Sequence, residues 1–93
     1  MNYLAIKKLQ KEHGYLEMQK LINSGEVWKM EGSMGRYAME LLTCGACMLP
    51  LHSHRDYYGN RIPSRTELAQ GSKGTYGNSV RFYSNINENE YCY

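Results

Sequence analysis

The sequence predicts a mostly α-helical, small single-domain fold with a long irregular middle segment. A chain of 93 residues, 42% of them hydrophobic, is long enough to build one modest core. Apolar residues recur at helical spacing in the first half, whereas Gly and Pro interrupt the stretch between residues 45 and 74. We therefore expect one domain over residues 1–86 and a polar tail over residues 87–93.

Two short helices are expected at the start of the chain. Residues 3–14 contain good helix formers, and Gly14 is expected to end this helix. Residues 15–25 carry apolar residues at helical spacing and finish with Asn-Ser-Gly. Residues 26–32 predict a connector, either a turn of helix or a short strand, in which Trp28 anchors the core.

The clearest helical pattern begins after Gly32. We expect Ser33 to cap this helix, Gly45 to end it and Pro50 to prevent its continuation. Five residues at helical spacing form a broad apolar face that predicts the central buried helix: Met34, Tyr37, Ala38, Leu41 and Leu42.

The second half of the chain predicts less regular structure. Residues 51–62 are expected to form a loop with a turn at Tyr-Gly-Asn. Ser64 and Glu67 match a capping box, which predicts a short helix that ends before Gly71. A last helix is expected from Thr75.

The overall charge is close to neutral. Eleven Lys and Arg against nine Asp and Glu give a net charge of +2, which is too small to indicate nucleic-acid binding through bulk charge. No apolar run is long enough to span a bilayer, so no membrane association is expected. Since the first residues do not resemble an export signal, the three cysteines are expected to be reduced, in a cytoplasm.

Two cysteines and two histidines lie within eleven residues, which raises the question of a metal site. Cys44, Cys47, His52 and His54 supply the thiolates and imidazoles that zinc accepts. However, only four residues separate the two pairs, and typical sites place a dozen or more there. We favour buried cysteines and loop histidines with no cofactor, and zinc is the lesser alternative. No third group is evident to orient a Cys/His pair for catalysis, so the chain is expected not to be an enzyme.

The start of the predicted central helix is a weak candidate for anion binding. Gly32, Ser33, Gly35 and Arg36 combine free N–H groups, a helix dipole and a guanidinium. The same residue types are also common in any helix cap, and the pattern lacks the Lys-Ser/Thr ending of a phosphate loop.

Arginine and tyrosine are interleaved in the irregular middle, a mixture typical of protein interfaces. Single-stranded nucleic acid or nucleotides would suit the same residue types, and self-association is compatible with them. Because the charge density is low, we favour a protein partner. The candidate partner-binding residues are Arg55, Asp56, Tyr57, Tyr58, Asn60, Arg61 and Arg65.

The order of several motifs resembles a family of small tailed-bacteriophage proteins. These motifs are Trp28, the Gly-Ser-x-Gly-Arg of residues 32–36, Leu-Pro at 49–50, the turn at 56–60, Pro-Ser at 63–64 and the Gly-rich stretch 71–74. The resemblance covers about half of the chain. It implies a phage-encoded accessory protein, and it carries no catalytic residues to transfer.

Small size, the lack of a catalytic arrangement and the Tyr/Arg-rich middle lead to one favoured function. We expect a non-enzymatic accessory protein that binds a host or bacterial defence protein and inhibits or redirects it in the cytoplasm of the infected bacterial host. The alternatives are a nucleotide or nucleic-acid binding module, which would use the helix start and the Arg/Tyr surface, and a small zinc-stabilised domain.

Overall fold

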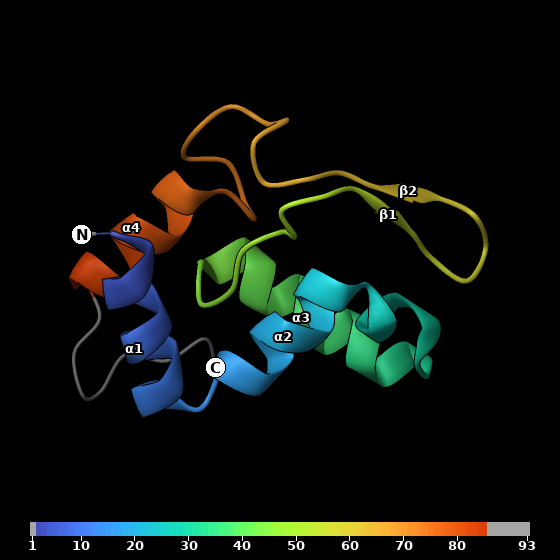
Figure 1. Cartoon of the computed structure of the whole chain (residues 1–93), viewed down its shortest axis with the longest axis horizontal. Coiled ribbons are helices and arrows are strands. Elements are labelled where there is room, and N and C mark those ends of the chain that lie inside the picture. The colour runs from blue at the N-terminus through green and yellow to red at the C-terminus, as the bar shows by residue number, and fades with distance from the viewer. Residues whose placement is uncertain (1, 86–93) are drawn as a thin grey trace.

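The computed structural model of the chain, which describes residues 2–85, confirms the mostly α-helical class (Figure 1). Four α-helices, one 3-10 helix and one hairpin make up this part of the chain. In chain order they are α1 (Tyr3–His13), α2 (Leu16–Ser24), η1 (Glu26–Lys29), α3 (Gly32–Cys44), β1 (His54–Arg55), β2 (Arg61–Ile62) and α4 (Tyr76–Asn85). The predicted tail over 87–93 lies outside the described residues. No described helix has the length and apolar content needed to cross a membrane.

The helix boundaries follow the local signals of the sequence, with one exception. The Asn2 side chain accepts a hydrogen bond from the Ala5 N–H (2.9 Å) and begins α1. The first three helices each end at a predicted glycine: Gly14, Gly25 and Gly45. The connector is a turn of 3-10 helix, one of its two predicted forms.

The exception is the cap of α3. Glu31 is the residue at the N-cap position, so Ser33 lies inside the first turn and the prediction of a Ser33 cap is wrong. The Ser33 hydroxyl donates instead to the Glu31 carboxylate.

The main core lies where α2, η1 and α3 pack together. Ile22 and Leu41 are fully buried there, and Trp28 is half-buried against the same cluster, as predicted. A smaller cluster joins α1 to α4 through Ile6, Met48 and Tyr83. The Tyr83 hydroxyl donates to the Ala46 carbonyl (2.6 Å), and its burial raises the pKa of the phenol.

The segment between α3 and α4 is held by side chains of its neighbours. The Gln19 amide donates to the Met48 carbonyl (2.9 Å) and accepts from the Met48 N–H (2.7 Å). Gln10 donates to the Ala46 carbonyl (3.1 Å), and the Ser79 hydroxyl donates to the Gly45 carbonyl (2.7 Å). These bonds satisfy a buried backbone that has no regular structure of its own.

Two expectations for this segment are wrong. Residues 51–62 contain a short antiparallel hairpin in place of a plain loop, with His54 opposite Ile62 and Arg55 opposite Arg61. In Figure 1 this hairpin extends away from α1 and α4.

The helix expected after Ser64 is absent as well, and only one of the two bonds of its capping box forms. The Ser64 N–H donates to the Glu67 carboxylate (2.8 Å). The Arg65 N–H donates to the Pro50 carbonyl (2.9 Å), and its buried guanidinium holds the backbone in a turn. One turn has too few hydrogen bonds to nucleate a helix against these contacts.

Candidate functional site

An open groove of about 650 Å³ lies between η1, the start of α3 and the turn of the hairpin. Three aromatic side chains line it, together with charged residues of both signs. The aromatic residues are Trp28, Tyr57 and Tyr58, and the charged residues are Lys29, Glu31, Arg36 and Asp56. The start of α3 and the hairpin turn, which were predicted as two separate candidate sites, thus line the same groove.

Asp56 fixes the backbone of the hairpin turn. One of its carboxylate oxygens accepts the N–H of Tyr58 (2.9 Å) and that of Asn60 (2.8 Å). The other oxygen accepts the Asn60 side-chain amide (3.2 Å). Aspartate commonly stabilises turns in this way. The Tyr57 N–H also donates to the Trp28 carbonyl (3.2 Å), which ties the turn to η1.

The two tyrosines of the turn are among the most exposed large side chains of the described residues. Tyr57 is 76% and Tyr58 85% exposed, and their rings meet edge to face at 5.3 Å. A fixed backbone therefore presents two aromatic rings to solvent at the rim of the groove.

The three arginines predicted to bind a partner do not line the groove. Arg55 donates to the Gly59 carbonyl (2.9 Å) within the hairpin, and Arg61 forms an ion pair with Glu67 (2.5 Å). Arg65 is only 4% exposed and therefore offers little surface to a partner. Its guanidinium donates to the Leu49 carbonyl (2.6 Å) and to the Asn23 side chain (3.0 Å), and it stacks over the Tyr3 ring at 5.4 Å. These arginines have structural partners within the chain.

The predicted anion site at the start of α3 is already occupied in part by the protein itself. The Glu31 carboxylate lies at this helix start and binds the Ser33 hydroxyl. Arg36 reaches back over Gly32, since a Cβ atom there would lie 3.2 Å from its Nη1. An external anion would meet Arg36 beside a fixed carboxylate, which weakens its attraction.

The four residues weighed as zinc ligands are not brought together. Cys44 is disulfide-bonded, so the expectation of a reduced thiol is wrong at this position. Cys47 is fully buried, and this burial raises the pKa of its thiol to about 12. The Nε2 of His54 donates to the Asn23 carbonyl (3.1 Å), and His52 is exposed. Within residues 2–85 no group of three or more His, Cys, Asp or Glu side chains has the geometry to hold a metal.

A small apolar pocket of about 180 Å³, which no sequence pattern predicted, lies beside the groove. Trp28, Met39 and Ile62 line both the pocket and the groove. Leu68 and Lys73 complete the rim of the pocket. The sequence signal that could have indicated this pocket is Met39, an apolar residue that falls off the apolar face of its helix. In the structure the Met39 side chain is 41% exposed.

Comparisons with protein-family models, with characterised proteins and with solved structures find no match to this chain. The resemblance to small tailed-phage proteins therefore stays a prediction, and the groove is interpreted from its own geometry.

Proposed function

We propose that this chain is a small non-enzymatic accessory protein, of the kind that tailed phages encode, which binds a host or bacterial defence protein. Binding would inhibit or redirect that protein. One observation carries the proposal: Tyr57 and Tyr58 stand exposed at the rim of the groove on a turn that Asp56 holds in place. Tyrosine is enriched among the residues that contribute most to protein–protein binding.

The lining of the groove favours a polypeptide as its occupant. Aromatic and thioether side chains give contact area, while Lys29 and Glu31 offer charge of both signs to a partner. The neighbouring apolar pocket has room for a single apolar side chain between Trp28 and Ile62. Interfaces commonly use one such buried anchor surrounded by polar contacts.

The fixed backbone also favours binding. The hydrogen bonds of Asp56 and the bond from Tyr57 to the Trp28 carbonyl hold the turn before any partner arrives. Less conformational entropy is then lost on association.

Affinity purification with matched variants tests this proposal. The wild-type chain, a Tyr57→Ser/Tyr58→Ser double variant and a Leu51→Ser control are used to recover proteins from bacterial lysate. Leu51 is 59% exposed and lines neither the groove nor the pocket, so it controls for the loss of exposed apolar surface. We expect a stoichiometric partner with wild type and control, and at least about tenfold weaker binding of the purified partner by the double variant. Equal recovery by all three chains, or by none, would contradict the proposal.

A nucleotide or nucleic-acid strand is the second candidate for the same groove. Lys29 and Arg36 line it beside stackable rings, which is the arrangement that binds single strands. Glu31 and Asp56 in the same lining oppose phosphate, so this candidate ranks below a protein. Thermal stabilisation by nucleotides or oligonucleotides that salt weakens and Arg36→Ala removes would reverse this order.

A further inference from the structure

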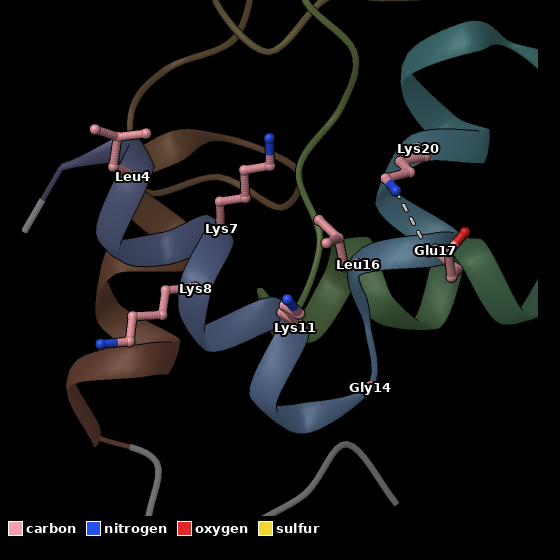
Figure 2. A pocket seen from close by; sticks show the side chains of 8 residues that line it. All are labelled: Leu4, Lys7, Lys8, Lys11, Gly14, Leu16, Glu17 and Lys20. Carbon is pink, nitrogen blue, oxygen red and sulfur yellow. Dashed lines mark hydrogen bonds and ion pairs between the residues drawn. The ribbon is translucent and has the colours of Figure 1, made fainter.

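A second groove, of about 540 Å³, lies between α1 and α2 and shares no residue with the first. Figure 2 shows how its side chains lie: Lys7 and Lys11 extend from α1, Lys20 belongs to α2, and Lys8 points to the far side of α1. Leu4 and Leu16 complete the apolar part of the lining. We call these residues, with Gly14 and Glu17, the lysine groove.

The positive charge of the lysine groove is largely unpaired. Within residues 2–85, Lys20 is the one lysine of the groove that forms an ion pair, with Glu17 at 3.4 Å. Lys7 and Lys11 are four residues apart on one helix, and like charges at this spacing destabilise the helix slightly. The fold therefore keeps a local repulsion that a negatively charged partner would relieve, although the net charge of the whole chain is only +2.

The lining also contains exposed apolar surface. Leu4 is 76% exposed and stands at one end of the groove, and Leu16 lies in its wall. Within the described part of the chain, Glu17 pairs with Lys20 alone, on the exposed surface of α2. Mixed cationic and apolar lining matches a peptide that carries both carboxylates and an apolar side chain.

We propose that the lysine groove binds an acidic segment of a partner protein, with Asp or Glu side chains on Lys7, Lys11 and Lys20 and one apolar side chain against Leu4 and Leu16. A nucleic-acid phosphate backbone fits the lining less well, because it would leave Leu4 and Leu16 without an apolar partner. None of the described residues that line the groove is aromatic, although Tyr3 lines the adjoining pocket that shares Lys7 and Lys20 with it. A partner bound at the first groove could use this second surface at the same time, but neither site depends on the other.

Peptide binding measured by fluorescence anisotropy tests the proposal. The probes are a labelled peptide of Glu and Leu, a matched peptide with Gln in place of Glu, and a matched peptide with Gly in place of Leu. Each is titrated with the wild-type chain, with Lys7→Ser/Lys11→Ser, and with the control Arg55→Ser/Arg61→Ser. Both double variants lose the same charge, and Arg55 and Arg61 line neither the lysine groove, the first groove nor the apolar pocket. Urea unfolding of each variant verifies that it is folded.

We expect the Glu/Leu peptide to bind the wild type and the control alike, and to bind the Lys7→Ser/Lys11→Ser variant about tenfold more weakly. Both matched peptides should bind the wild type more weakly, and salt should reduce the affinity of the Glu/Leu peptide. The proposal is overturned if that peptide does not bind at millimolar concentration, or if the two variants lose affinity equally. It is also overturned if duplex DNA or anionic lipid vesicles bind more tightly than the peptide and lose binding in the same variant.

Discussion

The helical layer and the irregular segment between α3 and α4 share an apolar core but differ in their polar contacts. In the helical layer, Ile22, Val27 and Leu41 bury their side chains against one another. The irregular segment adds Ala46, Cys47 and Leu49 to the same core.

The irregular segment is also fixed by buried polar side chains, above all Gln19 and Arg65, whose partners include main-chain atoms of residues 48 and 49. Apolar packing tolerates small shifts, whereas these hydrogen bonds fix particular backbone atoms. The hairpin is attached in both ways, because Ile62 packs against the main core and the Tyr57 N–H donates to the Trp28 carbonyl.

Removing the Arg65 side chain should break its hydrogen bonds to the irregular segment. We expect this change to have the largest effect on stability. In an Arg65→Ala variant the buried Leu49 carbonyl loses its side-chain donor and the Tyr3 ring loses its stacked guanidinium, whereas the Asn23 side chain keeps its bond from Gln19. An unpaired buried carbonyl costs about 1–3 kcal/mol, and the lost stacking and packing of a buried side chain adds about 1–2 kcal/mol, so we expect the free energy of unfolding to fall by about 4 kcal/mol in urea titrations.

Arg61→Ala is the matched control for Arg65. Arg61 is exposed and pairs with Glu67 on the surface, and such pairs contribute about 1 kcal/mol or less. Equal losses of unfolding free energy in Arg65→Ala and Arg61→Ala would show that the buried Arg65 guanidinium does not hold the irregular segment.

Gly74 and Gly59 allow a second comparison, with a smaller expected effect on stability. Both have a positive φ, but their surroundings differ. Gly74 (φ +82°) lies inside the irregular segment, where an added Cβ atom would come within 2.6 Å of the Leu49 side chain. Gly59 (φ +84°) lies in the hairpin turn, where an added Cβ atom meets no other atom within 4 Å.

An alanine at either position must adopt the left-handed backbone conformation, which costs about 1 kcal/mol. Gly74→Ala also overpacks the space beside Leu49, which costs more. We expect losses of unfolding free energy of about 3 kcal/mol for Gly74→Ala and about 1 kcal/mol for Gly59→Ala, measured by urea unfolding. A larger loss at Gly59 would mean that the hairpin turn, and not the packed segment, limits stability.

The sequence predicted the helical layer well because its signals are local. Apolar spacing placed the face of α3 that buries Ala38, Leu41 and Leu42, and glycines placed three of the helix ends. These features depend on residues within a few positions of each other.

The irregular segment was predicted poorly because its contacts join distant parts of the chain. Arg65 was expected on a binding surface, yet its guanidinium reaches Asn23, 42 residues away. Gln10 and Gln19 carried no pattern that would mark them as buried. The groove escaped prediction for the same reason, since Trp28, Arg36 and Tyr57 line it from three separate elements.

The titration of Glu67 tests a single contact of the irregular segment, and its expected effect on stability is the smallest. The Ser64 N–H is the main cause that lowers the pKa of its carboxyl group, and the hydrogen bond from Arg61 lowers it further. The folded pKa lies below the unfolded one, about 4.3 for glutamate, so the charged carboxylate stabilises the fold above that pH. This contribution is lost as the pH falls through the lower folded pKa.

We expect the Glu67 carboxyl to titrate below its usual range when it is followed by NMR. In Arg61→Ala the titration midpoint should rise but stay below the unfolded value, because the Ser64 N–H remains in place. In Glu67→Gln the acid-dependent part of this stability should disappear while the hairpin persists, since its register rests on backbone pairing of β1 with β2. A Glu67 midpoint at the unfolded value would mean that the capping bond between Ser64 and Glu67 does not form in solution. The attachment of this turn to the rest of the fold would then rest on the bonds of Arg65 to the Leu49 and Pro50 carbonyls.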